Sequence, residues 1–103
     1  MNFKEFWNKL SVELRHAREF STLTQQKIFE VQMTCRDTVT ILPRSTGIKR
    51  DIPMEQFHGM WDIMKNDMRT KRYVNYNKRY YEFWSSSYIS TLIDHVVKDQ
   101  RME

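Results

Sequence analysis

The segment that decides the fold is IFEVQMTCRDTVTIL, residues 28–42. In its first half, apolar and polar side chains alternate, and this period of two is typical of a strand that is buried on one face only. In its second half, β-branched residues dominate, which favours another strand. An Arg-Asp turn connects the halves, so the segment predicts an antiparallel hairpin of strands 28–35 and 38–42. One face of the first strand carries Phe29, Val31, Met33 and Cys35.

The residues on either side of the hairpin add a third strand and a helix. Pro43 ends the pairing of the second strand, and a loop leads to a short strand at 48–52. In that strand Arg50 interrupts an otherwise apolar face, which predicts a position at the edge of the sheet. Before the hairpin, apolar residues recur at helical spacing and predict a helix at 3–18, followed by a polar turn at 21–26. The inward face of that helix carries Phe3, Phe6, Trp7, Leu10 and Leu14.

Two further helices are predicted after the sheet. Pro53 suits the first turn of a helix that runs to about residue 67, with a stripe of Met54, Phe57, Trp61, Met64 and Met68. Residues 85–87 are serines that can cap a final helix whose inward face is Ile89, Leu92, Ile93, Val96 and Val97. The sequence therefore predicts one α+β domain, residues 1–103, in which an N-terminal helix, a three-stranded antiparallel sheet and two or three further helices pack together, the helices on one face.

Composition narrows the class of protein. A chain of 103 residues with 40% hydrophobic content supports one core. No stretch approaches the roughly 18 apolar residues of a membrane span, so we expect no membrane partner. The single cysteine, Cys35, excludes an intramolecular disulfide and a cysteine-based zinc site, and we expect it to be a small buried residue of a cytoplasmic protein.

Nothing in the sequence predicts an enzyme, a metal site or a cofactor. Two glycines are too few for a phosphate-cradling loop. Glu30-Val31-Gln32 resembles half of a restriction-nuclease site, but the aspartate that precedes it in such sites is missing. Asp51 and Glu55 suit the start of a helix through its dipole. The histidines fall on three different predicted helices, without ligand spacing: His16, His58 and His95.

The largest concentration of charge is RTKRYVNYNKRYYEFW, residues 69–84, which holds five cations and one carboxylate. Such a segment attracts a polyanion. Its cations are Arg69, Lys71, Arg72, Lys78 and Arg79. Its aromatic residues Tyr73, Tyr76, Tyr80 and Trp84 recur at helical spacing, which favours packing or an oligomer interface over stacking on bases.

A second basic segment is the predicted loop at 44–50, RSTGIKR. Arg44, Lys49 and Arg50 supply cations, Ser45 and Thr46 supply hydroxyls, and the glycine allows close approach of the backbone to phosphate. Together the two segments predict a protein that binds nucleic acid, with double-stranded DNA favoured. The alternative is a protein-interaction or homo-oligomeric assembly module built on the tyrosine stripe.

Between residues 22 and 93 the chain also resembles a known kind of small domain. The pattern consists of Leu23-Thr24, Phe29, Val31, Pro43, Ser45-Thr46-Gly47, Arg50, Ile52, Trp61 and Ser86-Ser87-Tyr88-Ile89. It is similar to α+β domains that occur as short proteins of mobile, integron-type gene cassettes and beside restriction-type endonuclease modules. The resemblance implies a non-catalytic accessory domain that contacts DNA, and it adds weight to Ser45, Thr46, Arg50 and Ser87. The segment 69–84 is longer and more aromatic than in those domains.

Overall fold

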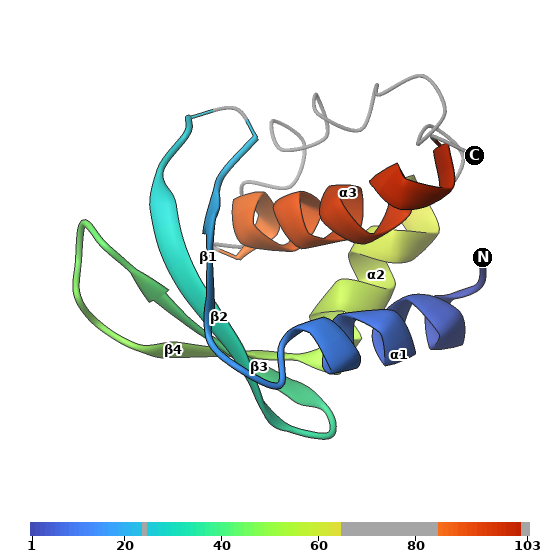
Figure 1. The fold of residues 1–103 in the computed structure, drawn as a ribbon, viewed down its shortest axis with the longest axis horizontal. Helices are drawn as coiled ribbons and strands as arrows, with labels where there is room; N and C mark the ends of the chain where they lie inside the picture. The colour runs from blue at the N-terminus through green and yellow to red at the C-terminus, as the bar shows by residue number, and fades with distance from the viewer. Residues whose placement is uncertain (24, 65–84, 102–103) are drawn as a thin grey trace.

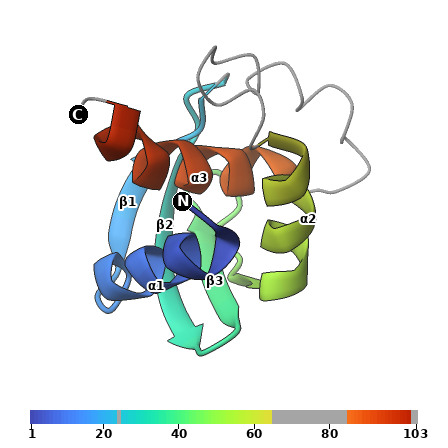
Figure 2. The same ribbon diagram turned by 90° about the vertical axis from the view of Figure 1, so that its right-hand side faces the viewer.

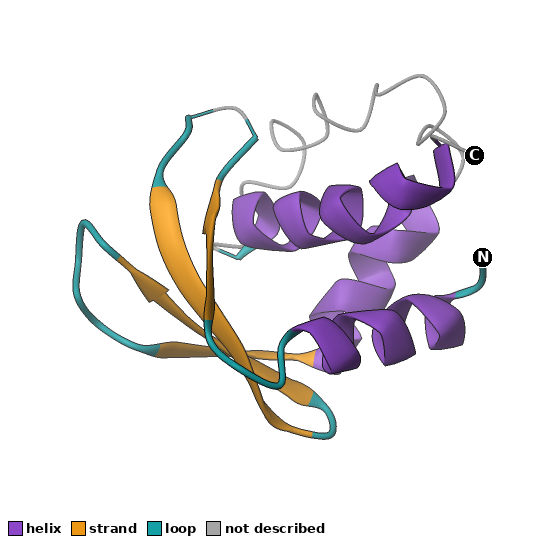
Figure 3. Cartoon of the chain, in the orientation of Figure 1, coloured by secondary structure: helices purple, strands orange, loops and turns teal. Residues whose placement is uncertain are grey.

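The predicted hairpin forms the centre of the sheet. In the computed structural model, which describes residues 1–23, 25–64 and 85–101, β2 (Ile28–Cys35) pairs antiparallel with β3 (Thr38–Pro43). A strand that the sequence did not predict, β1 (Arg18–Ser21), pairs with the other side of β2. β4 (Arg50–Pro53) pairs with β3, so the order is β1-β2-β3-β4 with every neighbouring pair antiparallel (Figures 1 and 3).

Three helices in the described part of the chain pack on one face of this sheet (Figure 2). They are α1 (Phe3–Glu13), α2 (Met54–Met64) and α3 (Ser86–Arg101). The predicted α+β class is confirmed, and the sheet has four strands where three were predicted. No helix among the described residues is long and apolar enough to cross a membrane.

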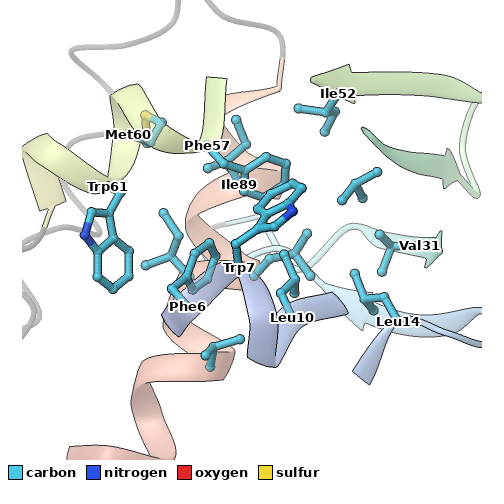
Figure 4. Packing of buried hydrophobic residues seen from close by; sticks show 14 of the residues in the cluster. Phe6, Trp7, Leu10, Leu14, Val31, Ile52, Phe57, Met60, Trp61 and Ile89 are labelled. Carbon is cyan, nitrogen blue, oxygen red and sulfur yellow. The ribbon is translucent and has the colours of Figure 1, made fainter. Parts of the chain in front are cut away.

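The core lies between the helices and the sheet (Figure 4). The sheet supplies side chains at alternate positions of β2 and β3, and all five residues predicted to face inward on the last helix are buried. Between α1 and α2 the core is aromatic, with the rings of Phe6 and Trp61 stacked 4.9 Å apart. The buried apolar residues are Phe6, Trp7, Leu10, Leu14, Phe29, Val31, Val39, Ile41, Ile52, Phe57, Met60, Trp61, Met64, Ile89, Leu92, Ile93, Val96 and Val97.

α1 is shorter than the predicted helix 3–18. Asn2 caps its start, with Oδ1 accepting a hydrogen bond of 2.8 Å from the Glu5 N–H. The helix ends after Glu13 because the Leu14 carbonyl accepts from the N–H of Met33 in β2, at 2.9 Å. The chain is then free to turn and pair with β2, and residues 18–21 become β1 instead of the last turn of a helix and the start of a polar turn.

Two strand details also differ from prediction. Cys35 is exposed, because the register of β2 against β3 shifts between Met33 and Cys35 and the alternation of inward side chains is lost there. β4 begins at Arg50 instead of residue 48, which leaves Ile48 59% exposed in the preceding loop. The predicted edge position is confirmed.

The start of α2 differs by one residue. Pro53 ends β4, paired with Thr38, and the helix begins at Met54, whose N–H donates to the Asp37 carbonyl in the hairpin turn at 2.7 Å. This bond gives a partner to one of the amide groups that a helix start leaves unpaired. The rest of that predicted helix, 65–67, and Met68 lie outside the described residues.

Candidate nucleic-acid interface

The loop between β3 and β4 is held in one shape by backbone hydrogen bonds, within the loop and to β2. The Arg44 N–H donates to the Ile28 carbonyl at 3.0 Å, and the Gly47 N–H donates to the Pro43 carbonyl at 2.9 Å. Gly47 has φ of +65°, a left-handed conformation that only glycine adopts without strain. The Thr46 hydroxyl oxygen accepts from the Ile48 N–H at 3.3 Å. The loop is thus a turn of defined geometry at one end of the sheet, away from the helices (Figure 1).

Every residue from 44 to 50 is exposed. The loop and the first residue of β4 therefore present to solvent, within seven consecutive positions, the side chains of Arg44, Ser45, Thr46, Lys49 and Arg50. Ile48 is one of three large apolar residues that are markedly exposed in the described part of the chain.

Arg44 has a partner within the protein. Its Nη2 lies 2.7 Å from Oε2 of Glu19 in β1, and both side chains are more than half exposed, at 64% and 56%. The pair spans β2, whose residue Ile28 holds the Arg44 backbone. The sequence did not predict this pair, because Glu19 lies on β1 and Arg44 directly follows β3, and these two strands are not neighbours in the sheet.

The sheet face opposite the helices is acidic. Strand alternation places Glu19, Glu30 and Asp51 there, because each is next to a residue that packs toward the helices. Glu19 and Glu30 are direct cross-strand partners. Asp51 accepts a hydrogen bond of 2.7 Å from Thr40, whose hydroxyl lies 2.8 Å from that of Thr34. A polyanion is repelled by this face, so the loop end of the sheet is the better approach.

The second predicted basic segment is not part of the described structure. Its cations and its aromatic stripe lie outside the described residues: Arg69, Lys71, Arg72, Lys78, Arg79, Tyr73, Tyr76, Tyr80 and Trp84. Their roles in phosphate binding or assembly stay predictions from the sequence.

Ser87, which the resemblance singled out, has a place in the fold. It lies half-buried in the first turn of α3, and its carbonyl accepts from the Thr91 hydroxyl at 2.7 Å and from the Ser90 hydroxyl at 3.2 Å. The Thr91 oxygen in turn accepts from the Leu23 N–H at 3.3 Å, which ties α3 to the β1–β2 connection. The neighbouring Tyr88 packs edge-on against Phe29 at 4.9 Å. This part of the pattern is explained by packing, away from the β3–β4 loop.

A second contact between titratable side chains that the sequence did not predict joins α1 to α3. His95 Nε2 on α3 lies 2.9 Å from Glu13 Oε2 at the end of α1. Both atoms are shielded from solvent, and neither has a hydrogen bond of regular geometry, so this short contact is what compensates for their burial. Arg18 lies 3.8 Å from the other Glu13 oxygen, and Phe20 packs edge-on against the His95 ring.

The remaining titratable residues that the sequence analysis considered lie apart from one another. His16 is exposed in the turn after α1, and His58 is exposed on α2, 3.9 Å from Asp62. Glu30 is exposed on the acidic face. Within residues 1–23, 25–64 and 85–101 there is no group of three histidine, cysteine or carboxylate side chains that is suited to hold a metal ion. A shallow hollow on α1 and α3 is lined by Asn8, Lys9, Val12, Glu13 and Val96.

Comparison of the chain with protein-family models, curated proteins and solved structures finds no match. The resemblance to gene-cassette proteins therefore stays a prediction from the sequence pattern.

Proposed function

We propose that this protein is a non-catalytic nucleic-acid-binding protein that contacts the phosphate backbone, with double-stranded DNA favoured. The observation that carries the proposal is the β3–β4 loop, in which cations and hydroxyls are exposed on a turn of fixed backbone. Phosphate contacts of this kind position a protein on a duplex without reading its sequence. In the proposed complex, Lys49 of this loop and Arg50 at the start of β4 contact phosphates, and the charge of the cations in segment 69–84 adds to the attraction for the nucleic acid.

The aromatic residues favour a duplex over a single strand. Binding of single strands uses aromatic side chains on which unpaired bases stack. In the described part of the chain, every Phe, Trp and Tyr is buried or half-buried, and the acidic sheet face has none. The described residues therefore offer no exposed aromatic surface on which bases could stack, and their contact with nucleic acid depends on charge.

Fluorescence anisotropy tests the proposal with a labelled duplex of mixed sequence and the matching single strand. At about 50 mM salt, where counterion release is most favourable, we expect the duplex to bind more tightly than the single strand. The double substitution Lys49→Gln/Arg50→Gln removes two cations, so the log–log dependence of affinity on salt should become shallower by about 2. Absence of duplex binding at low salt would overturn the proposal.

A matched control separates the loop from the net charge. Lys4 and Lys98 are exposed on α1 and α3, and the ends of these helices that carry them lie away from the β3–β4 loop (Figure 1). Lys4→Gln/Lys98→Gln removes the same charge, and we expect it to change the salt dependence much less. Equal effects of the two double variants would contradict a contact site at the loop.

The assembly alternative rests on the helical spacing of Tyr73, Tyr76, Tyr80 and Trp84 in the sequence. Light scattering distinguishes it: a monomer at all concentrations excludes homo-oligomeric assembly, whereas a dimer that dissociates on Tyr76→Ser/Tyr80→Ser supports it.

A further inference from the structure

We propose that Glu19 is an internal competitor for the nucleic acid: its carboxylate holds the Arg44 guanidinium in the free protein, and a phosphate of the ligand displaces it. This inference rests on the proposed function and adds a regulated step to the same site. It gives the β3–β4 loop a third cation whose availability depends on one residue of β1.

The geometry of the pair supports an exchange of partners. The 2.7 Å contact between Arg44 Nη2 and Glu19 Oε2 is that of a charge-assisted hydrogen bond, the kind that a guanidinium also forms with phosphate. Both side chains are more than half exposed, so a ligand can reach the guanidinium from solvent. The Arg44 backbone is fixed by its hydrogen bond to Ile28, and only the side chain has to move.

The energy of the exchange is small. An exposed ion pair stabilises a protein by about 0.2–1 kcal/mol, which corresponds to a factor of about 1.4 to 5 in an equilibrium constant. Release of Arg44 also leaves the carboxylates of Glu19 and Glu30 facing each other across β1 and β2. Like charges in this position are unfavourable, which adds to the cost of releasing Arg44. Glu19 therefore weakens binding by a few-fold without blocking it.

Glu30 supplies the matched control. It is exposed, carries the same charge and is the direct cross-strand partner of Glu19, so Glu30→Gln makes the same change in net charge on the same face of the sheet. The Arg44 ion pair is made by Glu19. Glu30→Gln also removes the repulsion that opposes release of Arg44, so the difference between Glu19→Gln and Glu30→Gln is a lower limit on the effect of the Arg44 ion pair.

The experiment measures duplex affinity by anisotropy at about 50 mM salt for the wild type, Glu19→Gln, Glu30→Gln, and the same two substitutions combined with Arg44→Gln, each checked for folding by circular dichroism. We expect Glu19→Gln to bind about two- to fivefold more tightly than Glu30→Gln, with this advantage lost when Arg44 is also replaced. Equal affinities of the two carboxylate variants, with the wild type bound, would overturn the competition alone. Absence of duplex binding by the wild type and every variant would overturn the proposed function, and the competition with it.

Discussion

Trp7 joins α1 to the turn of the central hairpin: its indole N–H donates a hydrogen bond of 2.8 Å to the carbonyl of Arg36. The same ring packs edge-on against Phe57 of α2, 5.2 Å away. One side chain thus connects the N-terminal helix, the β2–β3 turn and the second helix.

Replacing Trp7 with Phe tests this connection. The smaller ring leaves the Arg36 carbonyl without its donor and leaves a gap against Phe57, so we expect a loss of about 1–3 kcal/mol in the free energy of unfolding. Urea denaturation measures the loss. Val12→Ala on the same helix, at a position that is 58% exposed, should change stability by less than about 0.5 kcal/mol. If the two variants are equally stable, Trp7 has no bridging role.

The two glycines give opposite predictions for the same substitution. Gly47→Ala places a side chain at φ +65° and should destabilise the protein by about 1 kcal/mol. Gly59→Ala lies within α2, where an added Cβ meets no atom within 4 Å, and should stabilise the protein by about 0.5–1 kcal/mol. Thermal denaturation of both variants checks the signs. If Gly47→Ala is as stable as the wild type, the β3–β4 turn adopts another conformation at this residue.

The contact between Glu13 and His95 predicts energetic coupling between α1 and α3. Each of the two buried atoms is the polar partner of the other. The double variant Glu13→Gln/His95→Gln should therefore lose less free energy of unfolding than the sum of the losses of the two single variants, by about 1 kcal/mol. A double-mutant cycle in urea measures this difference. Additive effects would show that the two groups do not interact in solution.

Cys35 provides a test of the register shift in β2. Since the side chain is exposed beyond the bulge, a thiol reagent should modify it fully in the native protein. Cys35→Ser should change the free energy of unfolding by less than about 0.5 kcal/mol, as at other exposed positions. If the thiol reacts only after denaturation, Cys35 is buried, as the sequence predicted, and the register shift is wrong.

Local patterns were sufficient for the hairpin and for α3. The alternation through Phe29 and Val31 predicted the bounds of β2, and the apolar spacing from Ile89 to Val97 predicted the buried face of α3. β1 was missed because it has four residues and one inward apolar side chain, Phe20, which give no measurable period. Its formation depends on pairing with β2, which is a tertiary effect.

The candidate site shows the same division. The cations and hydroxyls of residues 44–50 were identified in the sequence, and the structure shows that these residues are exposed. The partner of Arg44 was not predicted, because Glu19 becomes its neighbour only through the pairing of β1 with β2. The same reason applies to Glu13 and His95, which meet where the end of α1 packs against the middle of α3.

We propose that nucleic acid contacts the β3–β4 loop. An NMR titration tests this contact most directly. Amide and arginine side-chain signals of the labelled protein are followed while an unlabelled DNA duplex is added at low salt. We predict that, among the residues described here, the largest shifts fall at 44–50, with small changes on the acidic strand positions Glu30 and Asp51. Shifts confined to the helices or to the acidic face, with residues 44–50 unchanged, would contradict the proposal.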